Sequence, residues 1–72
     1  MDTKSQKQID DIMYETNEKI SAIVTEFRDV KFSKLNESEK QVKCDYLRDE
    51  FEKVMLEEEK KVEQVMKNAN EN

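Results

Sequence analysis

The chain has 72 residues, enough for one domain at most. Acidic residues outnumber basic ones by 18 to 13, which gives a net charge of −5, and Gly, Pro and His are all absent. Turns and phosphate loops depend on Gly and Pro, and most catalytic triads and zinc sites depend on His. The composition therefore excludes most β-rich folds and those classes of site, and it predicts an all-α fold.

Residues 4–33 are predicted to form the first helix. From residue 9 to residue 30, apolar side chains recur at alternating intervals of four and three residues, and Thr16 is the only polar residue on that grid. Such a repeat is typical of a helix that buries one stripe against another helix. Two sequences with the spacing of a capping box, beginning at Thr3 and at Ser5, mark its start.

A turn is predicted at residues 34–38, where polar side chains replace the apolar ones. Asn36 has Glu39 three residues later, the spacing of a capping box that starts a second helix. Asn36 also suits the left-handed backbone conformation that ends many helices. The apolar grid fails between residues 34 and 48, where Lys34, Glu37, Gln41 and Arg48 occupy it. It resumes over residues 51–69, with Glu58 as its one polar exception, and a second helix is predicted over residues 39–68. Five acid-to-lysine pairs at i,i+4 are expected to support the helices: Glu15–Lys19, Glu39–Lys43, Asp49–Lys53, Glu57–Lys61 and Glu63–Lys67.

Two architectures fit this pattern. If the chain folds back near residue 37, residues whose numbers sum to about 74 face each other, so that Ile23 meets Phe51 and polar Thr16 meets polar Glu58. We therefore expect an antiparallel two-helix hairpin, coiled-coil-like, that completes a helical bundle with partner chains. A single long helix in a parallel coiled coil is the alternative. The predicted hairpin seam consists of Ile9, Met13, Ile20, Ile23, Phe27, Val30, Cys44, Leu47, Phe51, Met55, Val62 and Val65.

Several large hydrophobic side chains fall off this seam. A hairpin of this length has a small core, and its single cysteine cannot form an internal disulfide, so association with other chains is the expected source of further stability. Helices in a bundle also bury a broader apolar face than a two-stranded seam. The predicted partner interface consists of Tyr14, Val24, Phe32, Val42, Tyr46, Leu56 and Met66.

No chemistry is expected at any single site. Cys44 has no histidine to activate it as a nucleophile, and it is interpreted as a small hydrophobic side chain on the seam. Clusters of carboxylates lack the Gly of a calcium loop and the His of a di-iron bundle, so they are interpreted as solvated helix faces. We therefore predict no catalytic residue, metal, cofactor or small-molecule substrate.

The favoured function is a non-enzymatic structural or interaction subunit that buries the hairpin against protein partners in a larger assembly or against copies of itself. The alternative is a small acidic regulator, an inhibitor or chaperone-like adaptor, because residues 37–72 hold 11 acidic and 7 basic residues and would suit a basic client surface. The chain has no basic stripe or long apolar run, which argues against direct nucleic-acid binding and membrane insertion. One unpaired cysteine and a polar N-terminus predict an intracellular location, cytoplasmic or nuclear.

Overall fold

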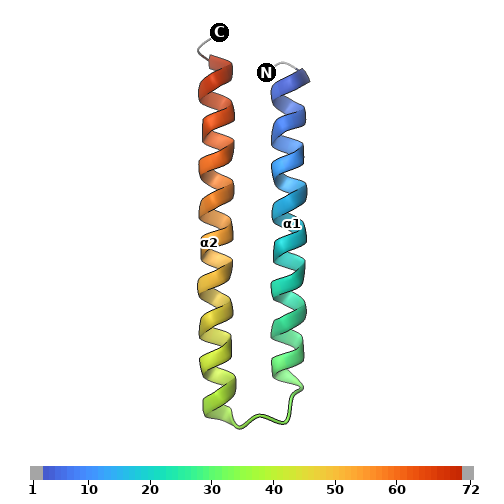
Figure 1. Cartoon of the computed structure of the whole chain (residues 1–72), viewed down its shortest axis with the longest axis vertical. Coiled ribbons are helices and arrows are strands. Elements are labelled where there is room, and N and C mark those ends of the chain that lie inside the picture. Colours follow the sequence, from blue (N-terminus) through green and yellow to red (C-terminus); the bar gives the residue numbers. More distant parts are fainter. Residues whose placement is uncertain (1–2, 71–72) are drawn as a thin grey trace.

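The computed structural model of the chain describes residues 3–70 and contains two helices, α1 (Thr3–Lys31) and α2 (Glu37–Asn70). The helices lie side by side and antiparallel, so the two ends of the chain lie at the same end of the molecule (Figure 1). The hairpin measures 55 × 15 × 9 Å. The predicted all-α hairpin is confirmed, and the alternative of one long helix is wrong. The first and last two residues of the predicted domain lie outside the described part.

The first helix ends at Lys31, two residues earlier than expected. The Ser33 hydroxyl donates a hydrogen bond to the Val30 carbonyl at 2.7 Å, and the Lys40 ammonium donates to the Lys31 carbonyl at 3.2 Å. The Phe32 amide donates to the Arg28 carbonyl at 3.1 Å. These bonds satisfy carbonyls that a helix leaves without partners in its last turn. They let the chain leave the helix at Lys31, and residues 32–36 make the connection.

Asn36 caps the second helix. The Glu39 amide donates to Asn36 Oδ1 at 2.8 Å, and Asn36 Nδ2 donates back to Glu39 Oε1 at 2.9 Å. The expected pair at this spacing is therefore present, although the returning bond comes from the side-chain amide and not from the backbone. No residue from 3 to 70 has a positive φ, so the expected left-handed conformation of Asn36 is wrong. Asn36 starts α2 and does not terminate α1.

Asn36→Ala is expected to destabilise the hairpin by about 1 kcal/mol, the usual cost of losing an N-cap side chain. For a domain of this size, the loss corresponds to a fall in Tm of about 4–8 °C. Ser38→Ala is the matched control, because Ser38 is an exposed residue in the first turn of α2. Thermal unfolding followed by circular dichroism measures both. A larger fall for Ser38→Ala than for Asn36→Ala would contradict the assignment of the cap.

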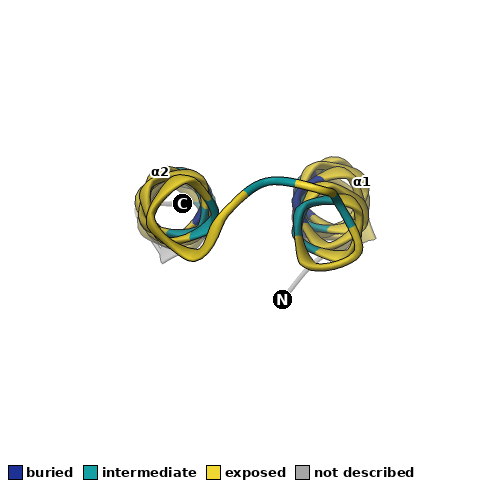
Figure 2. Cartoon of the chain, turned by 90° about the horizontal axis from the view of Figure 1, so that it is seen from below, coloured by how far each residue is buried: buried dark blue, intermediate teal, exposed yellow. Residues whose placement is uncertain are grey.

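The core is a single strip between the two helices, and buried positions face each other across it (Figure 2). Its buried hydrophobic residues are Ile9, Ile23 and Leu47. Ser5 and Thr16 of α1 are buried on the same strip. Because Ser5 lies inside α1 and contributes to this strip, a capping box that begins at Ser5 is wrong. No side chain in the described chain is completely inaccessible, so the core is narrow.

The residues predicted for the seam differ in burial. Ile9, Ile23 and Leu47 are buried, whereas Met13, Phe51 and Met55 are more than a third exposed and lie at the rim of the strip. The reason is that two helices alone cover only a narrow stripe of each other, and the flanks of the stripe stay open. The remaining seam residues are half-buried: Ile20, Phe27, Val30, Cys44, Val62 and Val65. Ile12, Val54 and Glu58 are half-buried as well.

Neither helix, over the residues described, is long and apolar enough to cross a membrane.

Candidate protein-interaction surface

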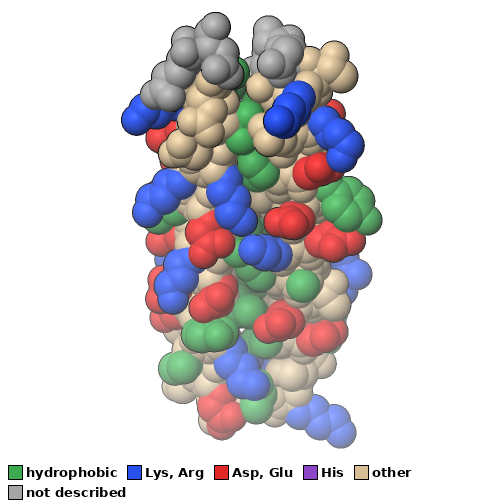
Figure 3. Space-filling view, turned by 45° about the horizontal axis from the view of Figure 1, so that its top comes forward, with side chains coloured by type: hydrophobic (Ala, Val, Ile, Leu, Met, Phe, Trp, Pro, Cys, Tyr) green, Lys and Arg blue, Asp and Glu red, His purple; other side chains and the backbone are tan. Residues whose placement is uncertain are grey.

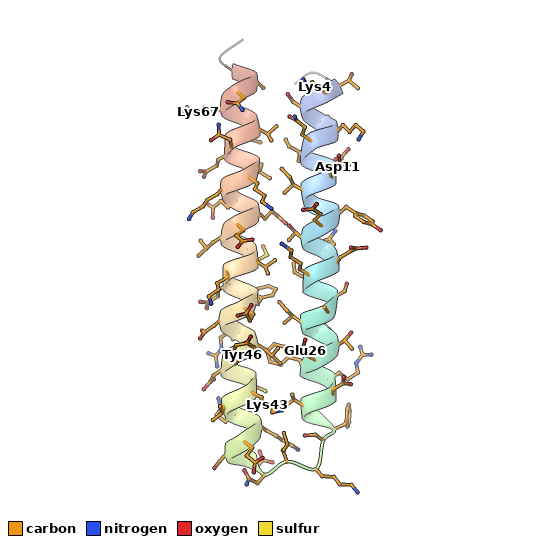
Figure 4. All side chains as sticks on the ribbon, in the orientation of Figure 1. Lys4, Asp11, Glu26, Lys43, Tyr46 and Lys67 are labelled. Atoms are coloured by element: carbon orange, nitrogen blue, oxygen red, sulfur yellow. The ribbon has the colours of Figure 1, made fainter. Side chains whose placement is uncertain are left out.

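One side of the strip between the helices is polar. Lys19 Nζ of α1 lies 3.8 Å from Glu57 Oε2 of α2, an ion pair that crosses between the helices. Toward the turn, a groove on this side has both charged and apolar lining residues: Glu26, Asp29, Val30, Val42, Lys43, Tyr46 and Leu47. Figure 4 shows Glu26 and Tyr46 on neighbouring stretches of the two helices. We call this side the polar flank. Its exposed ion pair adds little stability, about 0–1 kcal/mol, but it shows that Lys19 of α1 and Glu57 of α2 are nearly level in the hairpin.

The other side of the strip carries aligned apolar side chains. Met13 and Val24 are eleven residues apart in α1, which is close to three helical turns, so they lie in one line. Cys44, Met55 and Met66 follow the same eleven-residue spacing in α2. Val24 and Cys44 line one groove near the turn, which places the two lines on the same side of the hairpin. We call these five residues the apolar flank.

The apolar flank is open to solvent along most of its length. Its residues Met13, Val24, Met55 and Met66 are between 39% and 49% exposed, and Phe51, beside Met55, is 38% exposed. The polar flank, on the opposite side, is the face turned to the viewer in Figure 3, where charged side chains border hydrophobic ones along the junction of the helices. An aligned set of half-exposed hydrophobic residues with charges around it is the usual arrangement of a helix face that packs against another protein.

The seven residues predicted for the partner interface do not form one surface. Val24 and Met66 lie on the apolar flank. Tyr14 is nine residues before Ile23 and Leu56 is nine residues after Leu47, which is two and a half turns, so both lie on the outer side of their helices, away from the strip. The three others are also exposed and lie near the turn end: Phe32, Val42 and Tyr46.

Two residues of the apolar flank, Met13 and Met55, were not predicted as interface residues. Both lie on the heptad grid and were therefore assigned to the seam. Their eleven-residue spacing to Val24 and Met66 marks them as one line with those residues. A heptad grid identifies the apolar stripe by which one helix packs on the other. It does not show which edge of that stripe the other helix of the hairpin leaves exposed to solvent.

The remaining candidates for chemistry are dispersed. Cys44 is a free, half-buried thiol in the groove near the turn. Among residues 3–70, no group of three or more acidic or cysteine side chains is placed to hold a metal ion. Asp45 bonds to its own helix, since it accepts from Gln41 at 2.9 Å and pairs with Arg48 at 2.8 Å.

Comparison with known proteins adds no residue to this surface. Neither a protein-family model, nor a curated protein, nor a solved structure matches the chain. The candidate site is therefore defined by burial and helix geometry.

Proposed function

We propose that the chain is a non-enzymatic interaction subunit, working inside the cell, that packs its apolar flank against the helices of a protein partner. The observation that supports this function is the alignment of Met13, Val24, Met55 and Met66, all about half-exposed, on one side of the hairpin. These side chains pack well but do not react, and methionine in particular adapts its shape to a partner surface.

The surface area of the hairpin supports the same function. A compact protein of 8.6 kDa exposes about 4,700 Å² by the usual scaling of surface with mass. The hairpin exposes 5941 Å², about 1,200 Å² more than that scaling gives. Each side of a stable protein–protein interface buries about 800 Å². The excess reflects the thin shape of a hairpin that no third element covers, which leaves room for a partner along its length.

Val24→Ser is expected to weaken binding to the partner by about 1 kcal/mol, because about half of this side chain is already covered within the hairpin and only its exposed part leaves water on binding. Leu56→Ser is the matched control, because Leu56 is similarly exposed but lies on the outer side of α2. Titration of labelled chain against its partner measures both, and circular dichroism confirms that each variant keeps its helicity. Equal loss of affinity in the two variants would show that the apolar flank is not the interface.

The acidic regulator is the second candidate, and the charge of residues 37–72 favours it. In that function the carboxylates bind a basic client surface, so affinity falls steeply with added salt. Replacing both Glu57 and Glu59 by Gln would then weaken binding more than Val24→Ser does. If the chain is an interaction subunit, Val24→Ser weakens binding more than the double Gln variant does, and the affinity depends little on salt. The same titration at two salt concentrations therefore separates the two functions.

A further inference from the structure

We propose that the partner covering the apolar flank is a helical segment with carboxylates gathered at one end, and that these carboxylates lie against basic side chains at the turn end of the hairpin. This inference rests on the proposed function, because it names the chemistry of the partner for the same surface. Three observations support it: the lining of the groove at the turn end, the lack of carboxylate partners for its cations, and the distribution of charge along the chain.

The apolar flank ends in a groove near the turn. Val24 of α1 and Cys44 of α2 belong to the apolar lining of this groove. The charged lining consists of three cations and one carboxylate: Arg28, Lys31, Lys40 and Glu37. A partner side chain that reaches the turn end of the flank therefore meets an apolar surface bordered mainly by positive charge, which suits a segment with apolar and acidic side chains close together.

The three cations of the groove have no carboxylate partner in the described part of the chain, and Glu37 is not paired with any of them. The Lys40 ammonium bonds to the Lys31 carbonyl, and the Lys31 ammonium lies 5.9 Å from the centre of the Phe32 ring. The side chains of Arg28 and Lys31 are exposed. Basic residues in the last turn favour the negative end of a helix, but this role leaves their hydrogen-bond donors open to a carboxylate from outside.

The distribution of charge confines the carboxylates of the partner to one end of its segment. Residues 28–43, at the turn end, hold five basic and three acidic side chains, a net charge of +2. Residues 10–27 hold one basic and five acidic side chains, and residues 44–63 hold four basic and eight acidic ones, so each stretch carries −4. These two stretches run through the middle of the hairpin. Carboxylates on a partner are therefore favoured at the turn end and disfavoured beyond it.

The shape and charge of the surface favour a helical segment over an anionic lipid surface. The flank follows α2 from Cys44 to Met66, 22 residues or about 33 Å of helix. An amphipathic helix laid along such a face buries one apolar stripe over its whole length. A lipid surface that covered the flank would also face the negative middle of the hairpin, which repels anionic headgroups.

Binding of two synthetic peptides to the full chain tests the proposal. Both are amphipathic helices of about 22 residues with the same leucine stripe and neutral polar residues elsewhere. One carries glutamates at one end, and the other carries lysines in the same places. Fluorescence anisotropy should show that the glutamate peptide binds at least about threefold more tightly, although the net charge of −5 attracts lysine. Tighter binding of the lysine peptide, or binding of neither, would overturn the proposal.

Removing the cations tests where the carboxylates bind. Arg28→Gln combined with Lys31→Gln should abolish the preference for the glutamate peptide, because both changes lie in the groove. Lys60→Gln combined with Lys67→Gln is the matched control, since it removes two charges from exposed residues on another part of α2. It should keep the preference, and circular dichroism checks the helicity of each variant. Equal loss in the two double variants would show that the peptide responds to overall charge, which would overturn the proposal.

Further variants distinguish failure of this inference from failure of the proposed function. Val24→Ser should weaken binding of both peptides, while Leu56→Ser should change it little. If the lysine peptide binds more tightly and still follows that pattern, the proposed function stands without the acidic partner. Binding to phosphatidylserine vesicles in place of either peptide, lost on Arg28→Gln with Lys31→Gln, would assign the cations to lipid and overturn the inference. A dimer of the chain that neither peptide dissociates would show that a second copy covers the flank, and would overturn it as well.

Discussion

Leu47→Asp is expected to unfold the hairpin. Leu47 is the most buried hydrophobic side chain, with 4% of its surface exposed. The substitution removes its packing and places an unpaired charge in the strip between the helices, which together cost several kcal/mol. A core with three buried hydrophobic residues has little stability to lose. Far-UV circular dichroism should show the loss of helix at concentrations where the natural chain is folded.

Leu56→Asp provides the control for this substitution. It makes the same chemical change nine residues further along α2, on the outer side of the helix, where the side chain is 56% exposed. It is expected to lower the free energy of unfolding by no more than about 1 kcal/mol, the range for a surface substitution by a residue of weaker helix propensity such as Asp. Phe51→Asp should fall between the two, because the Phe51 side chain is 38% exposed and a charge there reaches water. Equal unfolding by Leu47→Asp and Leu56→Asp would contradict the placement of the core.

The double substitution Ile9→Cys and Val65→Cys, in a Cys44→Ser background, is expected to form a disulfide within the chain and to stabilise the hairpin by about 4 kcal/mol. Ile9 and Val65 lie on the strip near the open end, and their bridge closes a loop of about 55 residues. Restricting a loop of that length in the unfolded chain gives this stabilisation in the chain-entropy model. Denaturant unfolding under oxidising and reducing conditions measures it.

The control for the disulfide combines Ile9→Cys with Val54→Cys in the same background. Val54 is half-buried on the same strip but lies eleven residues, about 16 Å, further toward the turn than Val65. A disulfide does not form over that distance without movement of the backbone. Crosslinks that form only between chains in the variant with cysteines at positions 9 and 65 would show that α1 and α2 do not face each other.

The features of the fold that depend on neighbouring residues or on the helical period could be predicted from the sequence. The two helices follow from the apolar repeat, and the start of α2 follows from Asn36 and Glu39, whose hydrogen bonds the structure contains. The antiparallel arrangement follows from matching Thr16 to Glu58 when the chain is folded near residue 37. Each of these features depends on neighbouring residues or on one helical period, which is why the sequence alone indicates them.

Features that depend on contacts between the helices could not be predicted from the sequence. The first helix ends two residues early, and the bonds at its end include one from the Lys40 ammonium of α2, nine residues away, to the Lys31 carbonyl. Lys19 pairs with Glu57 across the strip and not with Glu15 on its own helix, as the i,i+4 spacing had suggested. The other four expected i,i+4 pairs are likewise absent from residues 3–70, where the ion pairs lie elsewhere. Such pairs are weak, so small differences in helix packing decide which of them forms.

The extent of the candidate surface also depends on packing between the helices. The predicted interface combined Val24 with residues such as Tyr14 and Leu56, because all of them lie off the heptad grid. Only the placement of one helix against the other separates those that line the strip from those that face outward. The same placement exposes Met13 and Met55, which the grid alone treats as buried.

Hydroxyl-radical footprinting of the chain with its partner bound measures which side chains association covers. Met13, Met55 and Met66 are about half-exposed in the single hairpin and react readily with radicals, while Tyr14 lies on the outer side of α1 as an internal control. Oxidation of these three methionines is expected to slow when the chain associates, while Tyr14 reacts at an unchanged rate. Protection of Tyr14 with no protection of the methionines would show that association uses another surface.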